Sequence, residues 1–173
     1  MIVCAGEIEQ FDGAYPIGIG MIDAAIILTK LCEKKRPEEL IFVGTAGSYG
    51  EIDIMQIVKS SSAVNIENSF FNAGAYTPMI DDVSCETSSQ ELIVNSSNYI
   101  TTDLSLGKYY QEKNIYLENM EFYAIAKVAK HFGISFRGIF CVSNYCNRNA
   151  HRDFIQNHSE AKELLSKEIE RIM

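Results

Sequence analysis

The sequence predicts a single α/β domain, residues 1–173, with a mostly parallel mixed sheet flanked by helices. Short apolar runs rich in β-branched residues alternate along the chain with longer segments of helical periodicity. The short runs are apolar at consecutive positions, as strands are when helices cover both faces of a sheet. The chain has 173 residues, 47% of them hydrophobic and 22% charged, which suits one core and is too short for two ordinary domains.

The expected strands are the continuous apolar runs. They lie at residues 1–5, 15–19, 39–43, 54–59, 62–66, 92–94 and 135–142. Residues 44–50 are expected to form a glycine-rich turn, and residues 68–90, rich in Asn, Ser, Gly and Asp, a surface loop. Glycine and polar residues follow several of these strands, and ligands of such sheets bind at the carboxyl ends of the strands. We therefore expect a binding site at that edge.

Three helices are expected. Residues 21–35 carry apolar side chains at helical spacing, and Pro37 follows the basic residues that end the segment. The second helix runs from about Asn119 to Phe132, with Gly133 in the position of a C-terminal glycine. The third begins near Ser159, the expected N-cap.

Charge and hydropathy exclude two classes of partner. The formal net charge of −8 would repel a phosphate-rich polymer, so no nucleic acid is expected. The longest apolar stretch, residues 17–32, is interrupted by glycines and charged side chains, which indicates a buried helix and no membrane span. No basic segment precedes the first apolar run, so a signal peptide is not expected.

Cysteine usage indicates a reduced, cytoplasmic protein. The chain has five cysteines, an odd number, and no CxxC pair. Most of them lie in apolar runs, where a free thiol acts as a small buried hydrophobe. No spacing of His, Cys, Asp or Glu resembles a metal site, so no metal is expected.

Several short motifs could carry chemistry, although each also has a structural interpretation. Gly44-Thr45-Ala46-Gly47 could hold an oxyanion or a sugar hydroxyl through its backbone N–H groups, or could simply be a turn. Glu121 could accept hydrogen bonds from sugar hydroxyls beside Met120, or could favour a helix dipole. Asn144 could bond a purine ring or cap a turn. The rings of Tyr99 and Phe154 could stack on a base or belong to the core.

The order of these motifs resembles the purine nucleoside phosphorylase and methylthioadenosine/S-adenosylhomocysteine nucleosidase superfamily. Matching segments run through nearly the whole chain. They are Ile17–Ala25, Arg36–Gly47, Val94–Thr102, Met120–Glu121, and Cys141–Asn144 with His151 and Phe154 beyond it. The resemblance implies a nucleoside phosphorylase-like fold that holds a purine nucleoside at its N-glycosidic bond.

The resemblance also implies roles for individual residues. Asn144 would face purine N7 and Glu121 would hold the ribose, and these two are the expected catalytic residues. The expected substrate-binding residues are Ile19, Thr45, Ala46, Gly47, Tyr99, Ile100, Met120, Ser143 and Phe154. Thr45 to Gly47 would lie where members bind phosphate or, in nucleosidases, the attacking water.

This chain departs from the family pattern at charged positions. Asn144 stands where most hexameric-type phosphorylases and the nucleosidases carry Asp, and an amide cannot protonate N7. Arginines of the family are replaced at Phe42 and around Cys141, which weakens the expectation of phosphate binding. Glu7 and Glu9 are both possible counterparts of the water-activating glutamate of the nucleosidases.

The main expectation is phosphorylase-type cleavage of a purine nucleoside, with 6-oxopurines favoured by Asn144. Inorganic phosphate is a possible co-substrate, and no other cofactor is expected. One alternative is a phosphate-independent nucleosidase of the methylthioadenosine/S-adenosylhomocysteine type, and another is a degenerate member that binds a nucleoside without turnover. A homo-oligomer, at least a dimer, is expected because Phe70 and Phe71 lie in the segment that crosses between subunits in dimeric relatives.

Overall fold

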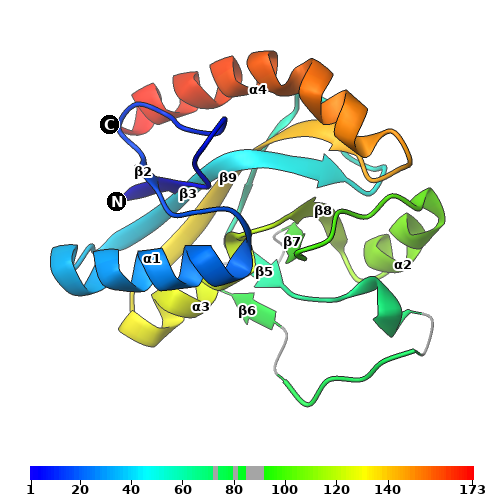
Figure 1. Ribbon diagram of the computed structural model, residues 1–173, viewed down its shortest axis with the longest axis horizontal. Coiled ribbons are helices and arrows are strands. Elements are labelled where there is room, and N and C mark those ends of the chain that lie inside the picture. The colour runs from blue at the N-terminus through cyan, green and yellow to red at the C-terminus, as the bar shows by residue number, and fades with distance from the viewer. Residues whose placement is uncertain (72–73, 80–81, 85–91) are drawn as a thin grey trace.

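The computed structural model describes residues 1–71, 74–79, 82–84 and 92–173 (Figure 1). The strands are β1 Ile2–Cys4, β2 Tyr15–Pro16, β3 Glu39–Ser48, β4 Ile57–Ser60, β5 Ser62–Val64, β6 Asp82–Ser84, β7 Ile93–Ser96, β8 Ile115–Asn119 and β9 Ser135–Tyr145. The helices are α1 Gly20–Lys35, α2 Gly107–Gln111, α3 Phe122–Phe132 and α4 Ala150–Ile172, with short 3-10 turns at Asn68–Phe70 and Leu104–Leu106. No helix in these described ranges combines the length and apolar content that a membrane crossing requires.

Strand β3 is the centre of a mixed sheet. It pairs in parallel with β1 and along its whole length with β9, and its last residues pair antiparallel with β8. Beyond these neighbours β2 and β1, β7 and β8, and β5 and β7 pair in parallel, whereas β4 with β9 and β6 with β5 are antiparallel. The structure therefore confirms the predicted α/β class with a mostly parallel mixed sheet.

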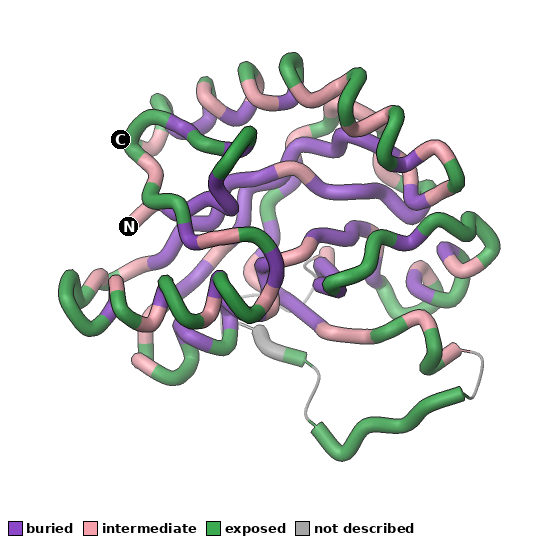
Figure 2. The backbone as a smooth tube through the Cα atoms, in the orientation of Figure 1, coloured by how far each residue is buried: buried purple, intermediate pink, exposed green. Residues whose placement is uncertain are grey.

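Helices cover both faces of the central strands, as continuous apolar runs predict. Alternate residues of β3 point to opposite faces. Leu40 and Phe42 pack in the cluster under α1 and α3, whereas Ile41 and Val43 pack in the cluster under α4. Figure 2 shows the central strands as mostly buried, with exposed residues on the outer sides of the helices.

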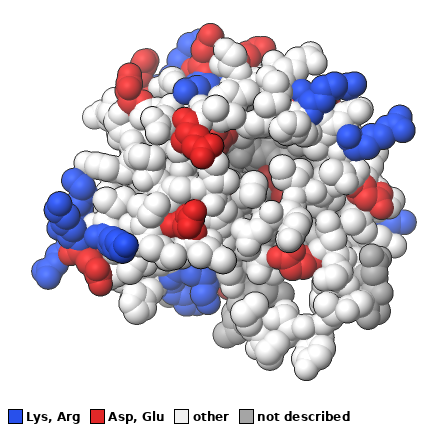
Figure 3. Space-filling view, in the orientation of Figure 1, with Lys and Arg blue, Asp and Glu red and all other residues white. Residues whose placement is uncertain are grey.

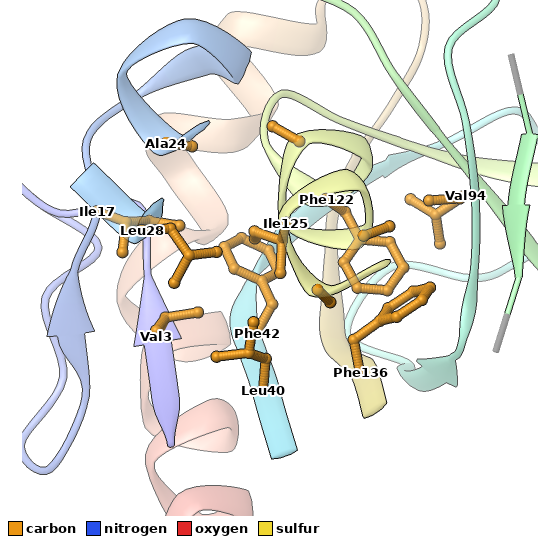
Figure 4. Packing of buried hydrophobic residues seen from close by; sticks show 14 of the residues in the cluster. Val3, Ile17, Ala24, Leu28, Leu40, Phe42, Val94, Phe122, Ile125 and Phe136 are labelled. Carbon is orange, nitrogen blue, oxygen red and sulfur yellow. The ribbon is translucent and has the colours of Figure 1, made fainter. Parts of the chain in front are cut away.

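The core under α1 and α3 is aromatic at its centre. The ring of Phe122 on α3 lies 5.1 Å from Phe140 of β9 and 6.2 Å from Phe42 of β3, measured between ring centroids. Leu28 of α1 and Ile125 of α3 close the cluster around Phe42 (Figure 4). On the opposite face Ala161, Leu165 and Ile169 of α4 are buried against the sheet.

The structure corrects two predicted boundaries next to the strand ends. Residues 44–48 were expected in a turn, but they continue β3, because β9 extends beside them and supplies hydrogen-bond partners up to the Ser48–Tyr145 pair. For the same reason Ser143 and Asn144 lie inside β9 and do not follow it. The pairing shifts register between Ala46 and Gly47, so the irregularity that the glycines suggested is a bulge and not a turn.

Two further elements differ from the prediction. Strand β8 was missed, and the helix expected from Asn119 begins at Phe122, because Asn119 ends the strand. Helix α4 begins after Asn149, so Ser159 lies in its interior and the predicted N-cap is wrong. The glycine stop at Gly133 is confirmed, with φ of 67° directly after α3. Much of the loop expected at 68–90 lies outside the described residues.

Candidate functional site

A pocket opens where β1, β3, β8 and β9 end, beside the first turns of α4. Its volume is about 250 Å³. In Figure 1, β3 and β9 run side by side toward the loop that leads into α4. The sequence-predicted residues in its lining are Ile19, Thr45, Ala46, Gly47, Ile100, Met120, Glu121, Ser143, Asn144 and Phe154. Parallel strands bring these distant segments to one edge, as the fold class predicts.

Tyr99 is the one predicted binding residue that the pocket lining does not include. Its side chain is 80% exposed, whereas the neighbouring Ile100 lines the pocket. Thr101 explains this arrangement, because its backbone N–H and hydroxyl both bond to the buried carboxylate of Glu118, at 2.7 and 2.5 Å. The chain is thereby anchored one residue beyond Ile100. The expectation that Tyr99 flanks a base is not supported by this geometry.

Glu9 reaches the pocket from a tight turn after β1. The backbone N–H of Glu9 donates to the carbonyl of Gly6 over 2.9 Å, which closes the turn, and Glu7 within it has a left-handed φ of 51°. The Glu9 carboxylate is buried and accepts hydrogen bonds from both the N–H and the hydroxyl of Thr45. Glu7 is exposed. Of the two candidates left open by the sequence, Glu9 is therefore the one fixed against the β3 segment.

Burial and the neighbouring groups have opposite effects on the pKa of Glu9. Burial raises the pKa of Glu9 above its ordinary value, because a carboxylate loses hydration inside the protein. The hydrogen bonds from Thr45 and the charges of His158 and Lys162 act against that rise. Such a carboxylate can accept a hydrogen bond from a bound donor and take a proton from it.

Glu121 is held rigidly just before α3. Its Oε1 accepts from the backbone N–H of Gly20 and its Oε2 from the side-chain amide of Asn119, both at 2.8 Å. Asn119 in turn accepts from the N–H groups of Glu121 and Phe122, and so caps the helix. Burial is the largest cause that raises the pKa of Glu121 to about 7, and the nearby Glu9 carboxylate adds to it. Glu121 is therefore a fixed, weakly acidic acceptor in the pocket wall.

Asn144 lies buried at the end of β9. The Ser143 hydroxyl donates to its Oδ1 over 2.8 Å, and its amide nitrogen donates to the carbonyl of Tyr145 over 3.2 Å. Gly47 on the adjacent strand makes room for it, since a Cβ at Gly47 would lie 3.0 Å from the Asn144 amide nitrogen and 2.9 Å from the sulfur of Cys146. The glycine is needed to seat this amide, a reason that the sequence did not disclose.

Glu118 is a pocket residue that sequence reasoning missed. Besides Thr101, it accepts a hydrogen bond from the hydroxyl of Tyr49 over 2.7 Å, and the Tyr49 ring stacks on Tyr110 with centroids 4.1 Å apart. Burial raises the pKa of Glu118. The available signal was a carboxylate directly after the apolar run Ile115–Leu117, but β8 itself was not predicted.

The lining is acidic. Glu7, Glu9, Glu118 and Glu121 contribute to it, and among the described residues no lysine or arginine does. In Figure 3 the Lys and Arg side chains lie toward the rim of this face, and several carboxylates lie nearer its middle. A phosphate dianion beside Thr45 would lie next to the Glu9 carboxylate, and no Lys or Arg of the described lining would offset the repulsion between them. No group of three or more His, Cys, Asp or Glu able to hold a metal ion occurs in the part of the chain that the structure describes.

Comparison with known proteins agrees with this arrangement. The phosphorylase superfamily model matches residues 2–173. The 5′-methylthioadenosine/S-adenosylhomocysteine nucleosidase of Staphylococcus aureus strain JH9 is 26% identical over 159 residues, covering 79% of this chain and 70% of that protein. A Helicobacter pylori nucleosidase of the same kind, an aspartate-to-asparagine mutant with 5′-methylthioadenosine in the active site, superposes with a TM-score of 0.82 at 14% identity, covering 98% and 95% of the two chains. Futalosine hydrolase of the same organism gives a TM-score of 0.80 at 14% identity, covering 98% and 94%.

These relatives correct the predicted reaction. Phosphorylase-type cleavage with a preference for 6-oxopurines was expected, but the relatives found are nucleosidases and a hydrolase, so that prediction is wrong. The physical reason lies in the pocket, where a carboxylate occupies the place in which phosphate was expected. The match of the superfamily model over residues 2–173 shows that the chain belongs to the phosphorylase superfamily.

Proposed function

We propose that this protein is a phosphate-independent nucleosidase that hydrolyses the N-glycosidic bond of a purine nucleoside of the methylthioadenosine/S-adenosylhomocysteine type. The observation that carries the proposal is the buried Glu9 carboxylate bonded to Thr45, in a pocket whose described lining has no cationic Lys or Arg side chain. Such a site suits a water molecule better than a phosphate dianion. The named activity of the sequence relatives supports the same conclusion.

In the proposed reaction the C1′–N9 bond breaks first, and its electron pair leaves with the base. The sugar becomes a cation resembling an oxocarbenium ion, which the carboxylates of Glu9, Glu118 and Glu121 in the lining stabilise. A water oxygen then bonds to C1′, and Glu9 takes the proton that the water loses. The departing base takes up a proton from solvent.

The remaining wall residues would bind and orient the nucleoside. Glu121 would accept hydrogen bonds from ribose hydroxyls, with Met120 beside the sugar. Asn144 would donate a hydrogen bond to purine N7, which stabilises the leaving base less than a proton would. Ile19, Ile100 and Phe154 supply apolar surface for the base and for an uncharged 5′ substituent. The proposal needs no metal and no organic cofactor.

The first test is base release from methylthioadenosine, S-adenosylhomocysteine, adenosine and inosine, with and without phosphate. We expect release without phosphate. Glu9→Gln should lower kcat by about 10²- to 10⁴-fold, the usual contribution of a general base, and the exposed Glu163→Gln on α4 should leave it unchanged. Release that requires phosphate, or loss of activity in Glu7→Gln and not in Glu9→Gln, would refute the proposal. Nucleoside binding without any turnover would do the same and would indicate a degenerate binding protein.

A homo-oligomer remains part of this proposal. Ile22 at the start of α1 is 68% exposed and Tyr99 is 80% exposed, and the N–H of Met21 bonds to the Asn98 side chain over 3.2 Å, which joins the two segments. A second subunit over this apolar surface would remove it from water. Light scattering of the purified protein tests the expected dimer or higher oligomer, and a monomer at micromolar concentration would contradict it.

A further inference from the structure

One face of α4 extends from the pocket lining to the loop that carries Glu9. His151, Phe154, His158 and Lys162 are spaced by three, four and four residues and so share one face of the helix. His151 and Phe154 line the pocket. The rings of Phe154 and His158 meet edge to face with centroids 5.2 Å apart. The next residue of this face, Lys162, lies beyond the pocket.

Lys162 contacts the loop that carries Glu9 at two places. Its ammonium group donates to the carbonyl of Ile8 over 3.1 Å, directly before Glu9 in the chain. The same group lies 5.8 Å from the centroid of the Phe11 ring, on the other side of Glu9. Phe11 is buried in the cluster under α4. Lys162 therefore joins the helix to the backbone before Glu9 and to the side chain of Phe11 after it.

The bond from Lys162 adds to the contacts that fix this loop. The loop leaves the sheet after β1 and returns at β2, its turn is closed by the Glu9–Gly6 backbone bond, and the Glu9 carboxylate accepts two bonds from Thr45. The left-handed φ of Glu7 costs free energy for a residue other than glycine. A hydrogen bond from Lys162 to the Ile8 carbonyl, in the last peptide of this turn, favours the conformation that places Glu9 against Thr45.

We propose that Lys162 is a positioning residue for Glu9: its bond to the Ile8 carbonyl fixes the Gly6–Glu9 turn and holds the ammonium charge beside the loop that carries Glu9. The inference rests on the proposed function only in giving Glu9 the role of base. The geometry of the turn and of α4 stands independently of it.

The charges around Glu9 support the second part of this role. Cys4 on β1 and Glu121 before α3 are the groups whose pKa the Glu9 carboxylate raises. The hydrogen bonds from Thr45 lower the pKa of Glu9, and charge interactions with His158 and Lys162, both from α4, lower it further. Loss of the Lys162 charge should therefore raise the pKa of Glu9.

The test compares Lys162→Met, Lys162→Gln and Lys162→Arg with the exposed control Lys167→Met on the same helix. In Lys162→Met we expect the acidic limb of the kcat/KM profile to move to higher pH, so that kcat/KM falls on that limb, with KM changed little. Arginine should restore the limb because it keeps the charge. Glutamine keeps a donor for Ile8 without the charge, so it should show the shifted limb even if Lys162→Met fails to fold.

Titration of the Glu9 carboxyl by ¹³C NMR, assigned with Glu9→Gln, gives a readout that needs no activity. A higher midpoint in Lys162→Gln, restored in Lys162→Arg, supports the inference. A midpoint equal to that of the wild type in folded Lys162→Gln overturns it. If the wild type releases no base at all, the proposed function fails, and the titration still decides whether Lys162 controls the ionisation of Glu9.

Discussion

Replacement of Glu121 by glutamine should change how the stability of this protein depends on pH. Burial raises the pKa of Glu121 from its ordinary value of 4.5 to about 7. Between these values the unfolded chain has released the proton and the folded chain still binds it. The folded state is therefore favoured at low pH, and this contribution is lost as pH rises from about 4.5 to about 7.

The magnitude follows from the size of the pKa change. A rise from 4.5 to about 7 corresponds to about 3 kcal/mol lost from the free energy of unfolding between pH 4.5 and 8. A glutamine side chain carries no titrating proton, so the Glu121→Gln variant should lack this part of the slope. Its amide meets the Asn119 amide where the carboxylate accepted, which costs free energy at every pH and does not alter the slope.

Urea denaturation at pH 5, 6, 7 and 8 measures this effect. The difference in free energy of unfolding between Glu121→Gln and the wild type should increase in favour of the variant by about 2 to 3 kcal/mol over that range. Glu163→Gln, at an exposed position of α4, is the control and should run parallel to the wild type. If the free energies of unfolding of Glu121→Gln and the wild type depend on pH in the same way, the Glu121 carboxyl is not buried away from water and its pKa is not raised.

Two substitutions test the end of β9. Asn144→Asp provides an acid that can protonate N7 of the leaving base. General acids contribute about 10²- to 10⁴-fold to rates, so we expect kcat for base release to rise at least about tenfold. No gain in a folded variant would mean that protonation of the base does not limit the rate. Gly47→Ala places a Cβ 3.0 Å from the Asn144 amide nitrogen and 2.9 Å from Cys146, so we expect a loss of about 1 to 3 kcal/mol in urea denaturation and lower turnover. Unchanged stability and turnover in Gly47→Ala would contradict the packing argument.

The central architecture could be predicted from the sequence because local pattern and tertiary packing agree there. The run Leu40–Val43 is apolar at every position, and both faces of β3 are buried. Gly133 ends α3 in a left-handed conformation that glycine adopts at little cost. Ten of the eleven residues proposed for the site lie in the pocket lining, since the carboxyl ends of adjacent strands meet at one edge.

What could not be predicted depends on partners that are distant in sequence. Gly44–Gly47 has the composition of a turn and becomes strand because β9 continues beside it. Ser159 has the character of an N-cap, yet the helix begins nine residues earlier, at Ala150. Nothing local separates Glu7 from Glu9, and only the fold shows that Thr45 meets Glu9. Tyr99 and Ile100 were both expected to bind the base, but only Ile100 lines the pocket, because the bonds of Thr101 to Glu118 fix the chain there.

The bond between Lys162 and Ile8 joins residues 154 positions apart. Closing so long a loop is entropically unfavourable until other contacts have already brought its ends together. Thr45 and Glu9 meet across 36 residues, and the ladder of β3 with β9 spans nearly a hundred. The sheet should therefore form during folding before the turn of Glu9 is clamped, and a partly folded chain with an intact core would still lack a competent pocket. Catalytic activity would therefore appear only after the last step of folding.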